Sequence, residues 1–195
     1  MGWITNLRQR LQGAGELEAA ADDLHALQHR IGYRFRNREL LDKALKHRSF
    51  VYAKQGDGIE SNERLEFLGD VVLDLIVAEF LFRKFEDKRE GDLTQMKSLF
   101  VSRTVLSRKA RGIDLGRFIL LSREERNAKG YDQPSILSDG FEALIGAIYL
   151  DGGLEASSRF IHRVVLHDFQ QQVQREDIVN FKSRLLELTQ SQGGG

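Results

Sequence analysis

Two segments of the chain place acidic residues at helical spacing within sequence that is otherwise apolar. Glu63, Glu66 and Asp70 are three and four residues apart and lead into the run VVLDLIVAEFLF. Asp139 and Glu142 are three residues apart and lead into ALIGAIYL. Side chains at these spacings share one face of a helix. A buried carboxylate needs a partner of opposite charge, yet no comparable set of Lys or Arg lies within these segments.

If two helices bring these faces together, four or five carboxylates converge. Such a cluster cannot remain ionised without cations, because like charges repel strongly at low dielectric. Ligand sets made only of oxygen select hard ions such as Mg²⁺, with Mn²⁺ as a substitute, over zinc or copper. Carboxylate-bound Mg²⁺ often also meets substrate phosphates. The pattern therefore predicts phosphodiester hydrolysis in which a metal-activated water is the nucleophile.

Other readings of the polar residues carry less weight. One acidic pair at this spacing is common on a solvated helix face, but two pairs within apolar sequence favour function. His25 and His29 are four residues apart, as metal ligands can be, but the sequence around them is polar, which predicts a surface pair. The chain has no nucleophile-elbow pattern and no Walker-type phosphate loop.

The composition suits a soluble globular protein. The 195 residues are 41% hydrophobic and 30% charged, and the absence of Cys excludes disulfides and thiolate-bound zinc. The net charge is zero, but the segment 97–111 holds five basic residues and no acidic one, so basic surface for phosphate is still expected. The sequence shows no signal-peptide core and no apolar run long enough for a bilayer. We expect a cytoplasmic protein without a membrane partner.

The elements that must position the acids are predicted to be helices, since apolar residues recur at helical spacing and strand-like alternation is scarce. We therefore expect an all-α fold. Helices are predicted near 16–31, 37–47, 62–84, 92–111, 135–150, 154–173 and 177–190. Polar loops are predicted at 53–61 and 122–134.

Two of these helices, 62–84 and 135–150, are expected to be central because they are apolar on nearly every side. Asn37 and Asn62 are predicted N-caps. Gly69 and Gly146 lie within the two central helices, where Gly weakens a helix by up to about 1 kcal/mol relative to Ala. We interpret them as sites where neighbouring helices approach closely.

The stretch NERLEFLGD at 62–70 resembles the signature motif of the ribonuclease III family. HRSFVYA at 47–53 and the blocks at 90–111 and 135–153 are similar to other segments of that family, in the same order and spacing. The resemblance covers about residues 27–170. It implies a ribonuclease III endonuclease domain over residues 27–173, a helical bundle around two central helices, preceded by an N-terminal helical extension over residues 1–26.

The resemblance also implies roles for individual acids. Four residues match the family's catalytic acids and metal ligands: Glu66, Asp70, Asp139 and Glu142. Glu63 and Glu90 match further acidic positions with supporting roles. One local departure is visible in the second acidic block, where Ser138 and Gly140 stand at positions that usually hold Ala and Ala, Thr or Val. Both ligand positions are intact, so we expect no loss of activity from this departure.

The resemblance implies that the protein is a Mg²⁺-dependent endoribonuclease. It is expected to cleave double-stranded RNA to 5′-phosphate and 3′-hydroxyl ends in RNA processing, including that of ribosomal RNA. Family members are homodimers whose two sites face one RNA groove. Phe67 matches a residue that packs into the partner subunit. Ordinary core packing is the alternative role for Phe67.

Recognition of duplex RNA is expected to depend on shape, phosphates and 2′-hydroxyl groups, because side chains cannot read its deep major groove. The candidate phosphate contacts are Arg103, Arg108, Lys109 and Arg111, with a solvated helix face as the alternative for each. The segment 180–190 resembles the first helix of a double-stranded-RNA-binding domain, so residues 174–195 are predicted to be a linker and the start of such a domain. RNA affinity would then depend on the nuclease surface and on salt.

Two rival functions stay open from the sequence. The first is a non-catalytic protein that binds structured RNA through a ribonuclease III fold, against which the four retained acids argue. The second is a di-iron oxidoreductase in a helix bundle. Such sites use Glu-x-x-His pairs, and this sequence contains none.

Overall fold

The computed structural model describes residues 24–169. Within this range the protein is built from helices, and the β-type pairing present is an isolated parallel bridge between Lys46 and Leu120. The expected all-α fold is thus confirmed. Most of the predicted extension over 1–26 and the whole predicted segment 174–195 lie outside the described residues. No described helix is both long enough and apolar enough to cross a membrane.

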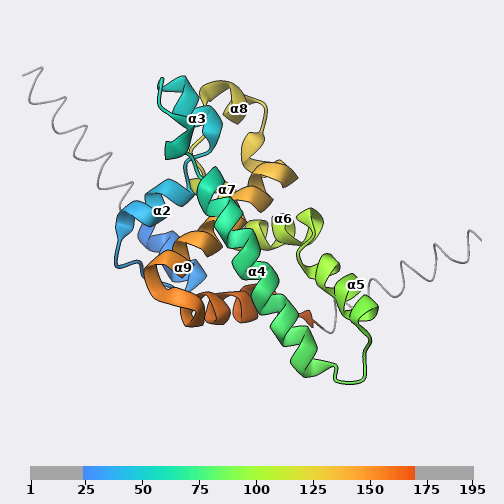
Figure 1. Ribbon diagram of the computed structural model, residues 1–195. Helices are drawn as coiled ribbons and strands as arrows, with labels where there is room; N and C mark the ends of the chain where they lie inside the picture. Colours follow the sequence, from blue (N-terminus) through green and yellow to red (C-terminus); the bar gives the residue numbers. More distant parts are fainter. Residues whose placement is uncertain (1–23, 170–195) are drawn as a thin grey trace, which may run out of the picture.

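The chain first forms a helical segment over 24–31 and then ten further named helices. In chain order these are α2 (Arg38–Ala44), α3 (Arg48–Ala53), the 3₁₀ helix η1 (Gly58–Glu60), α4 (Glu63–Lys84), α5 (Glu90–Phe100), α6 (Arg103–Gly112), α7 (Leu115–Phe118), α8 (Arg123–Asn127), the 3₁₀ helix η2 (Gly130–Asp132) and α9 (Pro134–Val164). In Figure 1, α4 crosses in front of α9, with α5 and α6 on one side and α3 and α8 at one end.

The two long helices α4 and α9 form the centre of the fold, as the sequence predicts. Each contributes fully buried side chains to one hydrophobic core, including Leu73 and Val77 from α4 and Phe141 and Leu144 from α9. Phe169, the last described residue, also packs into this core. Its ring stacks on the ring of Phe100, with the ring centroids 4.8 Å apart. Helix α9 therefore has few exposed positions, since neighbouring elements cover most of its length.

Glycine permits the close approach of α4 and α9. A Cβ at Gly69 would lie 1.8 Å from a backbone oxygen of α9, and one at Gly146 would lie 2.2 Å from the carbonyl oxygen of Leu65. Such distances are far shorter than any tolerated contact, so a larger residue at either position would push the helices apart. The prediction that these glycines allow helices to approach closely is confirmed.

The helix predicted over 92–111 is wrong as a single element. It is divided into α5 and α6 at Val101 and Ser102. Ser102 has extended backbone angles, and its hydroxyl accepts a hydrogen bond from the backbone N–H of Val105, which is the arrangement of an N-cap. A side chain that can satisfy a free N–H makes this break favourable without Gly or Pro.

The predicted loops hold short helices. Ser122 caps α8 by accepting from the N–H of Glu125, so the polar stretch 122–134 is partly helical. The stretch 53–61 likewise contains η1. The two helices predicted over 135–150 and 154–173 correspond to α9, which has a kink at Gly153 (φ 74°, ψ −174°). A positive φ is readily available to Gly, which explains the position of the kink.

The two predicted N-caps differ. The Asn37 side chain accepts from the N–H of Glu39 and caps α2, as predicted. Asn62 stands at the N-cap position of α4 but has helical backbone angles, and its side chain makes no capping hydrogen bond. The prediction that the Asn62 side chain caps α4 is therefore wrong.

Candidate metal centre

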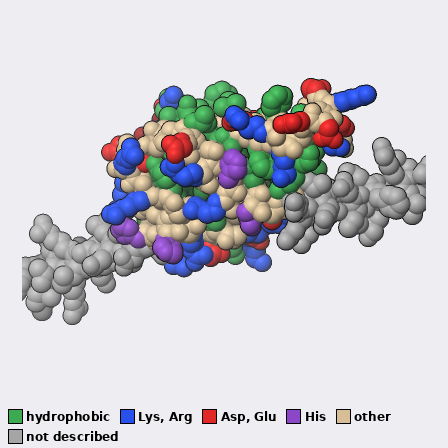
Figure 2. All heavy atoms as spheres, turned by 90° about the horizontal axis from the view of Figure 1, so that it is seen from below, with side chains coloured by type: hydrophobic (Ala, Val, Ile, Leu, Met, Phe, Trp, Pro, Cys, Tyr) green, Lys and Arg blue, Asp and Glu red, His purple; other side chains and the backbone are tan. Residues whose placement is uncertain are grey.

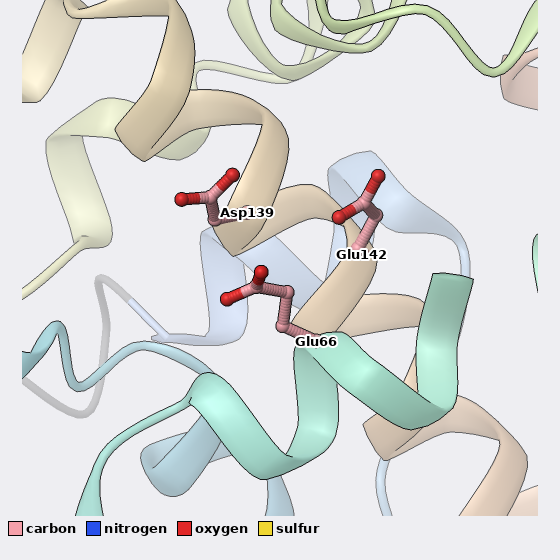
Figure 3. A group of neighbouring side chains, drawn as sticks. All are labelled: Glu66, Asp139 and Glu142. Carbon is pink, nitrogen blue, oxygen red and sulfur yellow. The ribbon is translucent and has the colours of Figure 1, made fainter. Parts of the chain in front are cut away.

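Three carboxylates from the two central helices meet in space. Glu66 comes from α4, and Asp139 and Glu142 come from α9. One carboxylate oxygen of each lies within 4.8 Å of the others, and all three side chains are half-buried. Figure 3 shows the three carboxylate groups converging on a common space between the two helices. We refer to these residues as the acidic triad.

The same glycine contact that joins the helices sets the geometry of the triad. Gly69 is one helical turn from Glu66 and lies against the backbone of Glu142. On α9, Gly140 lies between Asp139 and Glu142, where a Cβ would meet the Cδ1 atom of Ile119 at 2.8 Å. Gly140 thus packs closely against the end of the Ile119 side chain.

The charges of the triad oppose one another. Burial, followed by the charges of Asp139 and Glu63, raises the pKa of Glu66 to about 7. Burial, followed by the charges of Asp70 and Asp139, raises the pKa of Glu142 to about 8. These directions are those expected for carboxyl groups that are both desolvated and surrounded by like charge. The folded protein without a cation therefore holds these two groups partly protonated near neutral pH.

Asp70, the fourth predicted ligand, is more exposed than the triad and is outside the compact group of three. Its charge nevertheless acts on the triad. Among the neighbouring charges that raise the pKa of Glu142, the charge of Asp70 has the largest effect. A cation beside Glu142 would therefore also lie in the field of Asp70.

Glu63 lies at the rim of the same cluster and already has partners. Its carboxylate forms an ion pair with Arg48 at 3.4 Å and accepts a hydrogen bond from the Ser61 hydroxyl at 3.2 Å. Its side chain is 45% exposed. This arrangement holds Glu63 at the edge of the cavity, which suits a supporting role better than direct ligation.

Glu90, the other predicted supporting acid, lies elsewhere in this subunit. It is the first residue of α5, and its carboxylate accepts a hydrogen bond from the Thr94 hydroxyl at 2.9 Å. It lines a groove of about 660 Å³ between α4 and α5, next to Leu75 and Phe82. Within one chain, the structure does not bring Glu90 to the acidic triad.

A cavity of about 380 Å³ adjoins the triad. Glu66 and Asp139 line it together with residues that the sequence does not predict as part of the site, notably His47, Asn62 and Glu125. His47 lies in a segment that resembles the family and Asn62 is predicted as a cap, but the sequence assigns neither of them to the site. Glu125 lies in a stretch predicted to be a loop, where nothing in the sequence marked it.

The four candidate phosphate contacts have different environments. Arg103 and Arg108 are exposed on α6, and the charge of Arg103 reaches the triad, where it lowers the pKa of Glu142. Arg111 is bound to Asp132 by an ion pair at 2.6 Å.

Lys109 is buried and does not face an RNA strand, so its prediction as a phosphate contact is wrong. Its side chain is 7% exposed and pairs with Asp168 at 2.6 Å. A buried ammonium held by a carboxylate cannot reach an RNA phosphate, so Lys109 joins α6 to the end of the described chain instead. The charge pattern of the sequence could not distinguish a basic residue on the buried face of α6 from one on its exposed face.

The Phe67 side chain is not part of the core. It is 76% exposed, and Val71 and Leu75, at four-residue intervals along the same helix, are each 54% exposed. Phe82 continues this apolar face with 72% exposure. The core-packing alternative for Phe67 is therefore excluded within a single chain. His25 and His29 are both exposed, as predicted for a surface pair.

The donor set of the cluster fits a hard divalent cation. The three close ligands are carboxylate oxygens, which Mg²⁺ and Mn²⁺ prefer. Within residues 24–169, no Lys or Arg forms an ion pair with any member of the triad. A divalent ion would supply the close opposite charge that no ion pair provides within this range.

Comparison with known proteins agrees with this fold. A family model described as Ribonuclease-III-like matches residues 37–169. The chain is 47% identical over 140 residues to Ribonuclease 3 of Desulforamulus reducens, an alignment that covers 72% of this chain and 57% of that relative. It is 40% identical over 179 residues to Ribonuclease 3 of Pelotomaculum thermopropionicum, covering 90% of this chain and 73% of the relative.

Solved structures give the same result. The nuclease domain of ribonuclease III from Campylobacter jejuni matches with a TM-score of 0.69 and 42% sequence identity, covering 74% of this chain and 97% of that one. That protein is described as having a flexible region involved in dimer formation.

Proposed function

The chain belongs to the ribonuclease III family of endoribonucleases, and we propose that it cleaves double-stranded RNA with the help of Mg²⁺, leaving 5′-phosphate and 3′-hydroxyl ends. The observation that carries this proposal is the convergence of Glu66, Asp139 and Glu142 on one space. A bound divalent ion would there activate water and stabilise the leaving oxygen. The biological setting we propose is RNA processing in the cytoplasm.

The acidic residues would have different roles according to their positions. Glu66, Asp139 and Glu142 would hold the cation, with Asp70 contributing from the more exposed side. Glu63, fixed by Arg48, would shape the edge of the cavity. Mn²⁺ is expected to replace Mg²⁺, since both are hard ions that accept oxygen ligands.

We also propose that the active form is a homodimer built on the exposed face of α4. The side chains concerned, Phe67, Val71, Leu75 and Phe82, form an apolar stripe, and large exposed apolar patches commonly mark protein interfaces. Figure 2 shows hydrophobic side chains gathered along one edge of the molecule. The stripe borders the groove that contains Glu90, so a partner seated on α4 would also cover that groove.

Purified protein incubated with a perfect RNA duplex and Mg²⁺ tests the proposal. Cleavage is expected, with fragments that a ligase accepts at their 5′ ends because they carry phosphate. Cleavage should stop when EDTA is added and return with Mn²⁺. Binding of the duplex without cleavage under any divalent ion would instead support the non-catalytic RNA-binding function. Iron bound to the protein after purification would support the di-iron alternative.

A further inference from the structure

The Asn62 side chain is buried at the edge of the candidate site and has no hydrogen-bond partner there. The residue is 2% exposed. Its backbone is fully used, since its N–H donates to the carbonyl of Lys46 and its carbonyl accepts from the N–H groups of Leu65 and Glu66. Its carboxamide, by contrast, does not cap α4 and makes no hydrogen bond to any residue within 24–169. Buried polar groups normally have a partner.

The position of the carboxamide explains how this arrangement is tolerated. Over the described residues, no side-chain nitrogen or oxygen that is fully buried lacks a partner. The carboxamide atoms of Asn62 must therefore be reached from outside, and the cavity that Asn62 lines with Glu66 and Asp139 is the route. Water or a ligand in that cavity would complete the hydrogen bonds of the carboxamide.

The surroundings restrict the kind of ligand group. Besides Glu66 and Asp139, the cavity is lined by Glu63 and Glu125, and the Arg48 guanidinium that also lines it is already paired with Glu63. The carboxylates therefore outnumber this cation, and an anion would be repelled unless a further cation accompanied it. A carboxamide is uncharged and both donates and accepts hydrogen bonds. The group that matches it best is a neutral hydroxyl, which also does both. In an RNA substrate that group is the ribose 2′-hydroxyl, which DNA lacks.

We propose that Asn62 hydrogen-bonds the 2′-hydroxyl of a nucleotide beside the scissile phosphate, and that it is thereby a residue that selects RNA over DNA. This inference rests on the proposed function, because it assumes that a nucleic-acid strand enters the cavity. Side chains that carry a carboxamide are suited to this discrimination, since a site built to bond a hydroxyl is left with an unpaired group when the hydroxyl is missing.

The test combines one protein variant with modified substrates. RNA duplexes are made in which each nucleotide flanking the scissile phosphate is replaced, one at a time, by its 2′-deoxy form. For the wild type, one of these replacements should lower kcat/KM by roughly 3- to 10-fold, the size of one neutral hydrogen bond. For Asn62→Ala the all-ribose duplex should show the same loss, and the deoxy replacement at that position should add nothing further.

Controls separate this role from a structural one. Asn127→Ala removes an exposed asparagine at the end of α8 and should retain the wild-type sensitivity to the deoxy nucleotide. The Mn²⁺-induced shift of the melting temperature should be equal in wild type and Asn62→Ala. If Asn62→Ala does not fold, Asn62→Leu takes its place, because Leu has a similar shape and size but no hydrogen-bonding group.

Three outcomes would overturn the inference. One is a wild-type enzyme that is insensitive to every deoxy replacement. Another is a loss in Asn62→Ala that multiplies with the deoxy effect instead of replacing it. The third is a wild type that does not cut the all-ribose duplex, which would reject the proposed function itself and is distinguishable from the first two.

Discussion

The backbone of Gly69 lies against the carbonyl group of Glu142, so closely that a Cβ at Gly69 would be 1.8 Å from the carbonyl oxygen. This contact joins α4 to α9 at the point where each helix presents its acids. The separation between Glu66 and Glu142 is therefore set by the lack of a side chain at residue 69. The carboxylates converge because the two backbones touch.

Replacing Gly69 by Ala should separate the helices and harm both stability and activity. Overpacking of this kind destabilises a core by typically about 1–3 kcal/mol, and the displaced acids should lose affinity for Mn²⁺. Urea unfolding and Mn²⁺ titration measure the two effects. Gly91→Ala in α5 is the matched control, because nothing lies within 4 Å of its Cβ position. Equal unfolding free energies for the two variants would contradict the proposed role of the contact.

The stability of the cation-free protein should fall as the pH rises from about 4.5 to about 8. Below the ordinary Glu pKa of 4.5, both acids are protonated in the folded and unfolded states. Above it the unfolded chain releases these protons, whereas the folded protein retains them until pH 7 for Glu66 and about pH 8 for Glu142. The folded state then binds more protons, so its stability decreases with pH.

Thermal melting in EDTA at several pH values measures this trend. Mg²⁺ or Mn²⁺ should restore the melting temperature most strongly near pH 8, since both ions bind the ionised carboxylates. Glu142→Gln should weaken the pH dependence because it removes one of the two groups. A melting temperature in EDTA that rises between pH 5 and pH 8 would be incompatible with the like-charge cluster.

Glu142→Gln and Asp70→Asn should each abolish cleavage while preserving the fold. An amide has the shape of a carboxyl group but not its charge. Loss of a metal ligand should lower kcat by more than the roughly 10- to 100-fold effect of changing a residue that merely supports a ligand. Glu155→Gln is the control, since Glu155 forms a surface ion pair with Arg159 far along α9. Turnover like that of the wild type in either variant would refute the ligand assignment.

Phe67→Ser should convert the proposed dimer into a folded monomer. The side chain is 76% exposed in one chain, so its removal leaves no cavity in the core and the helical circular dichroism should be unchanged. Sedimentation equilibrium would report the mass. Tyr52→Ser is the control, because Tyr52 is also exposed (57%) but belongs to α3. A wild-type protein that is monomeric at high concentration would remove the basis for this prediction.

Arg103 and Lys109 should give opposite phenotypes although they are six residues apart on one helix. Arg103→Ala should weaken duplex binding and reduce the slope of log K against log salt by about one, without changing stability. Lys109→Ala should instead destabilise the fold by roughly 1–3 kcal/mol, since it removes the buried ion pair that joins α6 to Asp168. Salt-dependent binding assays and thermal melting distinguish the two. A large loss of RNA affinity in a stable Lys109→Ala protein would reverse this assignment.

Sequence pattern was a good guide to the long helices and to the acids they carry. The helix over 62–84 agrees with α4 almost to the residue, because apolar residues recur along its full length. Spacing also placed Glu66 and Asp70 on one helix face and Asp139 and Glu142 on another, and Gly69 and Gly146 were predicted as contact points within these helices. These features depend on helical periodicity, which a single chain displays directly.

Features that depend on tertiary packing could not be predicted in the same way. The break between α5 and α6 at Ser102 occurs without Gly or Pro, and a serine inside a helical pattern does not by itself predict an N-cap. Lys109 looks like any surface lysine until α6 is packed against the last described residues. Asn62 has the sequence features of a cap, but the turn before α4 gives it helical backbone angles, so its side chain is left for the cavity.

Helix α9 is anchored just before its kink at Gly153. There the Asp151 carboxylate accepts three hydrogen bonds, from the Tyr33 hydroxyl at 2.6 Å and from the backbone N–H groups of Arg36 and Asn37 at 2.9 and 2.7 Å. The same helix thus carries the carboxylate oxygens of Asp139 and Glu142 near its start and binds residues 33–37 near its kink. Amide exchange at residues 36 and 37 should consequently slow when a cation binds more than a helical turn away, making a remote backbone position a reporter of occupancy.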